Sequence, residues 1–155
     1  MSIVQTQQII GPGGGGVFVE KNRTATFAVD ASSNHGAYRG RSITSSGDHN
    51  FTFVVPAEFD ALISIELYGI PESSFTSQDI DLDSNYGGLG ENYQTHVEAD
   101  HTGTYSGVIN SGFSLDLSSV FSALSAGDRC GVLVDHNVIG DTINYLMIVL
   151  NYTVA

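Results

Sequence analysis

The chain has little cysteine, no tryptophan and few basic residues. Of its 155 residues one is cysteine and five are lysine or arginine, against seventeen aspartates and glutamates. The single cysteine, Cys130, excludes an intramolecular disulfide framework, and we interpret it as a buried structural thiol. The net charge of −12 argues against binding to nucleic acid or to an anionic membrane, because both would be repelled.

Long apolar runs are also absent. The longest, residues 146–150, is far shorter than the roughly 20 residues of a membrane-spanning helix. Residues 1–8 have neither the basic cluster nor the apolar run of a secretory signal. A chain of 155 residues is long enough for one domain, or for one domain and an arm.

The positive charge lies almost entirely before residue 50. Residues 1–49 hold four of the five basic residues and three carboxylates, a net +1, whereas residues 50–155 hold Arg129 and fourteen carboxylates, a net −13. This contrast predicts two parts: an N-terminal arm over residues 1–49 and a compact body over residues 50–155. Such a plan is typical of a structural subunit whose arm binds a neighbour.

The expected arm contains a flexible joint and a long irregular stretch. Residues 11–16 read Gly-Pro-Gly-Gly-Gly-Gly, a sequence that restrains the backbone little. Residues 30–49 lack periodicity, and residues 24–29 have the pattern of a strand that could instead join the body as its first strand. The arm's apolar and basic residues are the predicted partner contacts: Phe18, Val19, Lys21, Arg23, Phe27, Tyr38, Arg39, Arg41 and Ile43.

The body has the pattern of an all-β protein. Short runs of alternating and β-branched residues recur with turn signals every 8–12 residues or so, which predicts an antiparallel β-sandwich. Residues 116–127 differ, because Leu117, Val120, Phe121 and Leu124 have the spacing of one helix face. We therefore expect an antiparallel β-sandwich with one short helix and an extended N-terminal arm.

One acidic run is the sharpest candidate for a ligand site. Asp79, Asp81 and Asp83 alternate with Ile80 and Leu82, as in the opening of an EF-hand loop, but the glycine and glutamate that such a loop needs further on are missing. Three interpretations remain open: a solvated strand face, a contact for a basic arm, and a weak divalent-ion site. The five histidines show no metal-ligand spacing. We therefore predict no metal site beyond the weak candidate at Asp79, Asp81 and Asp83, and no cofactor.

No catalytic motif stands out in the chain. Gly-x-Ser-x-Gly is absent, and nothing marks a nucleophile among the many serines. We therefore expect no catalytic residues and no enzymatic activity.

The body resembles the small jelly-roll virion proteins of tailed bacteriophages, namely capsid decoration or cement proteins and related head- or tail-fibre domains. The resemblance covers residues 50–155, while residues 1–49 have no firm counterpart. The segments that carry it are residues 51–56, 63–71, 79–83, 90–93 and 116–128, followed by two closing strands that reach Ala155.

The resemblance implies a jelly-roll fold and a structural role. Proteins of this kind are commonly trimers on capsid surfaces, so the implied partners are a major capsid protein and further copies of the chain. The implied location is the capsid surface of a virion, and the host cytoplasm during assembly. Alternatives are a fibre or receptor-binding module that recognises host glycan or protein, another oligomeric jelly roll of the C1q or tumour-necrosis-factor type, and an enzyme.

Overall fold

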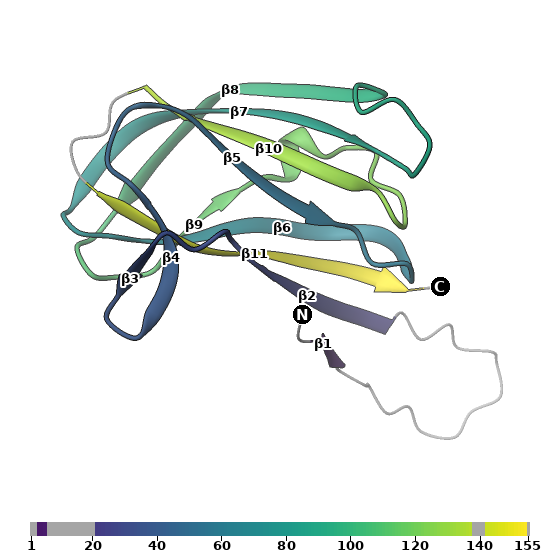
Figure 1. Cartoon of the computed structure of the whole chain (residues 1–155), viewed down its shortest axis with the longest axis horizontal. Helices are drawn as coiled ribbons and strands as arrows, with labels where there is room; N and C mark the ends of the chain where they lie inside the picture. The colour runs from purple at the N-terminus through teal and green to yellow at the C-terminus, as the bar shows by residue number, and fades with distance from the viewer. Residues whose placement is uncertain (1–2, 6–20, 138–141, 155) are drawn as a thin grey trace, which may run out of the picture.

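The protein folds as an antiparallel β-sandwich with a jelly-roll architecture (Figure 1). The computed structural model describes residues 3–5, 21–137 and 142–154. Within these residues no helix is long and apolar enough to cross a membrane. The strands are β1 Ile3–Gln5, β2 Lys21–Ala28, β3 Ser33–His35, β4 Tyr38–Ile43, β5 Gly47–Val54, β6 Phe59–Pro71, β7 Phe75–Gly87, β8 His96–Gly107, β9 Phe113–Asp116, β10 Arg129–His136 and β11 Ile143–Val154.

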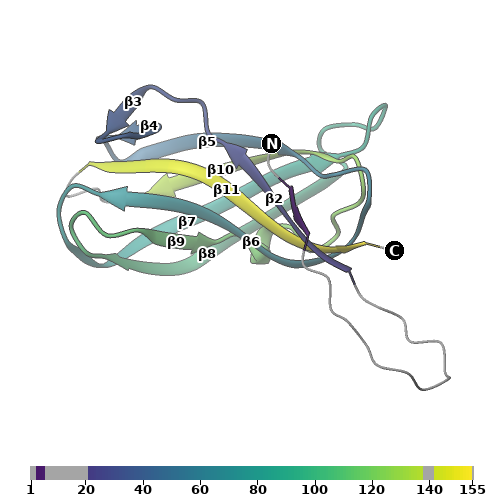
Figure 2. The ribbon, with the colours of Figure 1, turned by 90° about the horizontal axis from the view of Figure 1, so that it is seen from below.

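The C-terminal strand β11 organises the larger of the two sheets. It pairs with β6 along one side, and with both β2 and β4 along the other. β1 extends the sheet beyond β2, β9 extends it beyond β6, and β3 pairs only with β4. The β3–β4 hairpin projects from the end of the sandwich opposite the C-terminus (Figures 1 and 2). The smaller sheet has the order β5-β10-β7-β8, so β5 and β8 are its edge strands.

The core lies between the two sheets and follows the alternation of the strands. In β10, for example, Cys130, Val132 and Val134 are buried while the residues between them are not. Aromatic rings tie the layers together: Phe53 and Phe121 meet edge to face with centroids 5.3 Å apart, and Phe51 meets Tyr145 in the same way. Such pairs add to the stabilisation that burial of their apolar surface supplies.

The expected short helix over residues 116–127 is a single turn of 3-10 helix, Ser118–Val120. The spacing did identify the core-facing residues, because Leu117, Val120 and Phe121 are fully buried. The α-helix does not form because side chains of the sandwich bind the segment's backbone instead. Three side chains bind this backbone. Ser84 Oγ donates to the Val120 carbonyl, and Tyr86 Oη accepts from the Ala123 N–H at 3.1 Å. The Glu98 carboxylate accepts from the Ser122 N–H.

Glu98 and Tyr86 also bind each other and thereby anchor this segment to the sandwich. Burial, together with the neighbouring Glu98 carboxylate, raises the pKa of Tyr86 to about 12. Burial alone would raise the pKa of Glu98 as well, but hydrogen bonds from Tyr86 and Ser122 outweigh that effect and lower the pKa of the carboxyl group. At neutral pH the pair is therefore a phenol donating to a carboxylate.

Residues 21–49 lie largely within the sandwich. The sequence left open whether residues 24–29 join it, and β2, Lys21–Ala28, pairs with β11 along its whole length. β4 pairs with β11 as well, and β5 begins at Gly47, so residue 50 falls inside a strand. The irregular stretch expected over residues 30–49 thus contains β3, β4 and the start of β5. A free arm can be expected only before residue 21, and residues 6–20 lie outside the described part of the chain.

Candidate binding groove at an open edge of the sandwich

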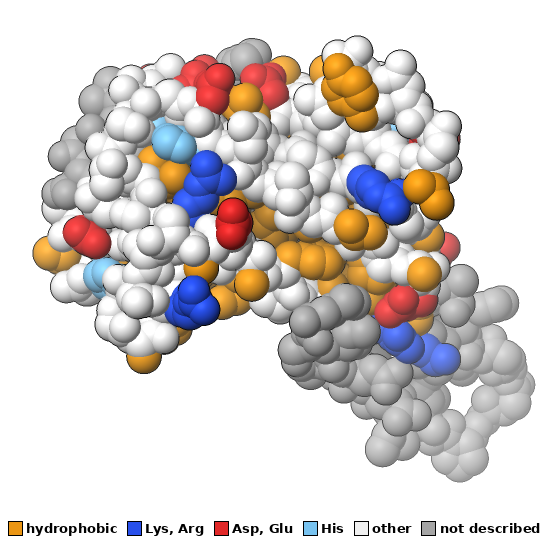
Figure 3. Space-filling model, in the orientation of Figure 1, with side chains coloured by type: hydrophobic (Ala, Val, Ile, Leu, Met, Phe, Trp, Pro, Cys, Tyr) orange, Lys and Arg blue, Asp and Glu red, His pale blue; other side chains and the backbone are white. Residues whose placement is uncertain are grey.

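A hollow lies where β5 of one sheet and β2 of the other face each other across an open side of the sandwich. Its volume is about 750 Å³. Figure 3 shows hydrophobic side chains exposed in this hollow, near the centre of the face. We call it the edge groove, and its lining residues are Thr26, Phe27, Ala28, Thr52, Phe53, Val54, Asn85, Tyr93, Arg129, Cys130 and Gly131.

Among the described residues, two strand edges at the groove lack a neighbouring strand over part of their length. Of the described strands only β10 pairs with β5, and the bond from the Val55 N–H to the Asp128 carbonyl (2.9 Å) sets the alternation of their ladder. Backbone groups of Phe53 therefore face β10, whereas those of Thr52 and Val54 face outward. In β2, the register with β1 covers only Arg23, Thr24 and Ala25. The groove thus borders strand edges that carry no further described strand, and unpaired strand edges are templates for pairing with another chain.

The groove continues on both sides of β5. On the inner side, Phe27 and Phe53 approach each other with ring centroids 5.6 Å apart and form its apolar wall. On the outer face, the register places Thr52, Gly131 and Asn85 in one row across three strands. Gly131 leaves a trough in the middle of that row, and a methyl group there would contact only the Asn85 carbonyl, at 3.8 Å.

Tyr93 and Arg129 stand at one end of the groove. Tyr93 is 72% exposed, and both residues also line a smaller hollow formed by residues 87–91. Arg129 is the sole basic residue among residues 50–155. No carboxylate in the described part of the chain forms an ion pair with it. The nearby Glu91 accepts a hydrogen bond from the Gly88 N–H (2.7 Å).

A second arginine lies further along the same edge. Arg41 Nη1 donates to the Asn50 carbonyl (2.6 Å), and its guanidinium lies 5.5 Å from the centre of the Phe51 ring. This contact ends the unpaired stretch of β5, because the outward carbonyl of Asn50 is already bonded. The open part of β5 therefore extends over Thr52 and Val54, with Arg41 on one side and Arg129 on the other.

The structure distributes the predicted partner contacts over several places. Phe27 lines the edge groove and Arg41 borders it. Arg23 binds Glu58 (3.1 Å), Tyr38 and Arg39 are exposed on the hairpin, Lys21 is exposed at the start of β2, and Ile43 belongs to the core. Phe18 and Val19 lie outside the described residues. Sequence reasoning missed Thr52, Tyr93 and Gly131, and it noted Arg129 only as the lone cation of the body.

The acidic run of β7 behaves as alternating strand residues. Ile80 and Leu82 point into the core, and Asp79, Asp81 and Asp83 lie on the other face. Within the described residues, no three histidine, cysteine, aspartate or glutamate side chains are placed to hold a metal ion. The weak metal candidate at these three aspartates is therefore not supported.

Strand pairing adds two carboxylates that the sequence could not align with this run. The register places Asp135 of β10 directly between Asp48 of β5 and Asp81 of β7. Like charges directly opposite each other on a sheet destabilise it.

Asp135→Asn is therefore expected to raise the free energy of unfolding by about 0.5 kcal/mol at low salt. Chemical unfolding of both proteins tests this, and the gain should shrink in about 1 M NaCl, where screening is short-ranged.

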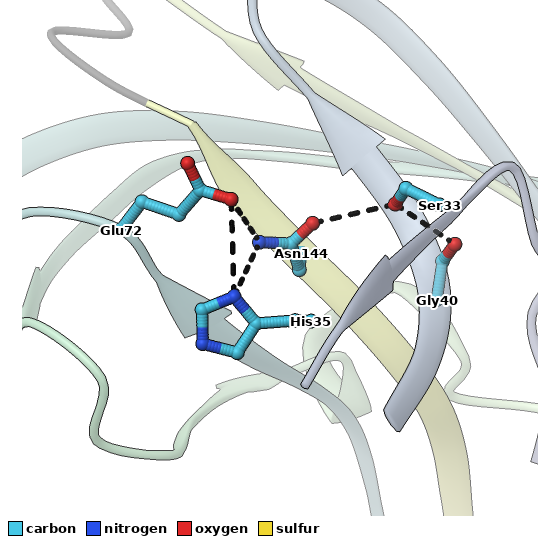
Figure 4. Close-up of polar contacts among 5 residues, drawn as sticks. All are labelled: Ser33, His35, Gly40, Glu72 and Asn144. Atoms are coloured by element: carbon cyan, nitrogen blue, oxygen red, sulfur yellow. Dashed lines mark hydrogen bonds and ion pairs between the residues drawn. The ribbon is translucent and has the colours of Figure 1, made fainter. Parts of the chain in front are cut away.

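A polar cluster joins the β3–β4 hairpin to β11 (Figure 4). The buried Asn144 donates to Glu72 (3.0 Å), lies 3.4 Å from a ring nitrogen of His35, and accepts from Ser33 (3.4 Å). Ser33 also donates to the Gly40 carbonyl (3.2 Å), and no contact joins it to His35. Serine, histidine and glutamate are thus near one another without the serine–histidine contact that activates a nucleophile. The cluster fastens the hairpin.

Asn144→Ala is expected to lower the free energy of unfolding by about 1–3 kcal/mol, because it removes a buried side chain that hydrogen-bonds to Glu72 and Ser33. Urea unfolding measures the loss. Ser33→Ala is the matched control: it removes one hydroxyl from the rim of the cluster and should cost less. Equal stability of the Asn144 variant and the unsubstituted protein would show that the cluster does not fasten the hairpin.

Cys130 is a free, buried thiol, as the sequence suggested. Burial, with a smaller contribution from the Asp128 carboxylate, raises the pKa of Cys130 well above that of an ordinary thiol. The thiolate that nucleophilic chemistry needs is therefore scarce at neutral pH.

Comparison with known proteins yields structural neighbours alone. No family model matches the chain, and no curated protein matches it. The CBM36-1 domain of a multidomain xylanase from the hindgut metagenome of Trinervitermes trinervoides is similar with a TM-score of 0.48 and 12% identity, over 82% of this chain and 95% of that one. A carbohydrate-binding module CBM36 in complex with calcium and xylotriose gives 0.43 and 12%, over 82% and 98%.

A viral protein is similar to about the same degree. In the structure of infectious bursal disease virus, Gx strain, the match has a TM-score of 0.43 and 11% identity, over 94% of this chain and 36% of that one. Similarity at this level does not extend to ligands or partners.

Proposed function

We propose that the protein is a structural attachment protein that decorates and stabilises a viral capsid by binding the shell surface. The observation that carries this proposal is the edge groove, an apolar hollow whose strand edges and whose arginine, Arg129, have no strand or ion-pair partner among the described residues. These are features of a contact surface for another protein chain. The resemblance of residues 50–155 to jelly-roll virion proteins adds the expectation that this partner is a major capsid protein.

The proposed action is mechanical. Each copy buries the edge groove against the shell, and many copies sum modest contacts into resistance to pressure from within. A standard interface buries about 800 Å² per partner, and binding through several copies of one oligomer multiplies its effect. Because the body is strongly acidic, decorated particles repel one another electrostatically, and this repulsion keeps them soluble.

The matched variants Val54→Asp and Ile63→Asp test this proposal. Both side chains are 50% exposed on strands, but Val54 lines the edge groove and Ile63 lies on β6 of the other sheet. Each protein is mixed with shells assembled from the coat protein of the same genome, and the shells are pelleted. Val54→Asp is expected to reduce co-pelleting by about tenfold or more, as loss of a buried interface contact does. Ile63→Asp should pellet like the unsubstituted chain, and equal pelleting of all three would contradict attachment through the groove.

Oligomerisation is a separate part of the proposal. A homotrimer is expected to elute from a sizing column with light scattering at about three times the chain mass of 16.4 kDa. A monomer at micromolar concentration would contradict a preformed trimer and leave assembly on the shell as the route to multivalency.

A glycan- or receptor-binding module is the second candidate. It is favoured by the exposed Tyr93 beside Asn85 and Arg129, because an exposed aromatic ring next to polar side chains can stack on a sugar. Screening on immobilised oligosaccharides tests this function. Binding that Tyr93→Ala abolishes would favour it, whereas a protein that binds no oligosaccharide would exclude glycans as the ligand.

A further inference from the structure

The structure assigns the edge groove an occupant: we propose that it binds an extended, acidic peptide segment of the partner protein, which adds as a further strand to β5. The inference rests on the proposed function and deepens it by naming the chemistry of the partner.

The shape of the edge groove favours a strand over a compact ligand. Its lining includes Phe27 and Phe53 on the inner side of β5, and Thr52, Gly131 and Asn85 on the outer face. Side chains of a strand point alternately to the two faces of its sheet. A strand laid along β5 would therefore fill both parts of the groove at once, which a sugar on the outer face would not do.

The backbone of β5 is available for such pairing. Thr52 and Val54 turn their N–H and C=O groups away from β10, toward the side on which no strand is described. Peptide recognition by addition of a strand draws its affinity from these main-chain bonds and its specificity from alternate side chains. The contact of Arg41 with the Asn50 carbonyl limits the added strand to the stretch beyond that residue.

The charged residues along the edge groove predict which side chains the bound strand carries. A residue opposite Val54 would project its side chain on the outer face, in the row that contains Val54 and Arg129. Arg129 is the sole cation of residues 50–155, and no described carboxylate pairs with it in spite of the fourteen that this part of the sequence holds. At the other end lies Arg41. The favoured strand has acidic residues at both ends and apolar residues opposite Phe51 and Phe53.

Two synthetic peptides test the proposal on the full chain. The acidic probe is Ser-Glu-Val-Thr-Val-Glu-Ser, which reads the same in either direction, and the basic probe replaces both glutamates with lysine. Affinities are measured by isothermal titration calorimetry. Although the protein carries a net charge of −12, the acidic probe is expected to bind at least about fivefold more tightly. Arg129→Glu should reverse this preference, which a merely structural role for Arg129 would not do.

A backbone variant tests the strand itself. Thr52→Pro removes an outward N–H that makes no bond to β10, and proline is tolerated on edge strands in that position. This variant should weaken the acidic probe by about tenfold or more, while Thr52→Ala should bind like the unsubstituted chain. Thermal melting checks that both variants fold, and if Thr52→Pro does not fold, the charge reversal at Arg129 decides.

Three results would overturn the proposal. The first is that neither probe binds up to about 1 mM, the weak end of specific affinities. The second is that the basic probe binds at least as well as the acidic one. The third is that the protein is an oligomer that Thr52→Pro dissociates, because a second copy would then occupy β5. If Val54→Asp no longer co-pellets with shells and neither peptide binds, strand addition is rejected but attachment through the groove stands. If the acidic peptide binds but the unsubstituted protein does not co-pellet with shells, the attachment function is rejected and strand addition stands.

Discussion

A chain that begins at residue 50 is expected not to fold. It lacks β2 and β4, both of which pair with β11, and it lacks the buried Ala25 and Ile43. Removing these strands leaves one long side of β11 without backbone partners and exposes apolar surface that the core needs. Circular dichroism and thermal melting of the truncated protein should therefore show no cooperative transition.

The matched truncation begins at residue 21. It retains β2, and of the described strands it loses β1 alone, which pairs with β2 through Ile3, Val4 and Gln5. Its free energy of unfolding should stay within about 3 kcal/mol of the full chain, as expected for a few backbone hydrogen bonds. Any role of an N-terminal arm in attachment has to be tested with this protein. A cooperative melt of the chain that begins at residue 50 would contradict the fold described for residues 21–49.

Stability is expected to fall by about 3 kcal/mol between pH 6.5 and pH 4 because of one buried histidine. His136 is fully buried, and its Nε2 lies 2.9 Å from the Tyr145 hydroxyl, while its Nδ1 has no hydrogen-bond partner among the described residues. Burial, with a smaller contribution from the neighbouring His49, lowers the pKa of His136 to about 4. Its ordinary pKa is about 6.5, so within this window the unfolded chain binds a proton that the folded chain does not.

Because the unfolded chain binds the extra proton, the free energy of unfolding falls as the pH falls. The contribution of His136 is complete above pH 6.5, declines as the pH falls toward 4, and changes no further below it. Urea unfolding at several pH values measures the slope. In the double variant His136→Phe with Tyr145→Phe, which leaves no orphaned hydroxyl, this slope should largely disappear. Tyr145→Phe alone keeps the histidine and should keep the slope, and an unchanged slope in the double variant would contradict the assignment.

The strand pattern of the sequence predicted much of the fold. The alternation over residues 79–83 predicted that Ile80 and Leu82 lie in the core and that the three aspartates lie outside it. The structure agrees. The pattern over residues 24–29 was that of a strand, and β2 covers most of them. These features depend on local periodicity, which a single sequence records directly.

Features that depend on pairing between distant segments could not be predicted in this way. The spacing of Leu117, Val120 and Phe121 indicated a helix, but Tyr86 and Glu98, more than twenty residues earlier, bind that backbone instead. The edge groove likewise depends on register, which sets Val54 beside Arg129. Knowing that Arg129 is the lone cation of the body gave no indication that it stands at the end of an apolar hollow.

Attachment of this protein to a shell through the open edge of its sandwich is tested most directly by a cryo-electron microscopy reconstruction of particles from the source of the sequence. We expect density for the sandwich on the outside of the shell, with β5 and Arg129 against a shell subunit and an extended shell segment beside Thr52 and Val54. Particles that lack the protein, or that carry it with the edge groove facing solvent, would contradict attachment through this groove.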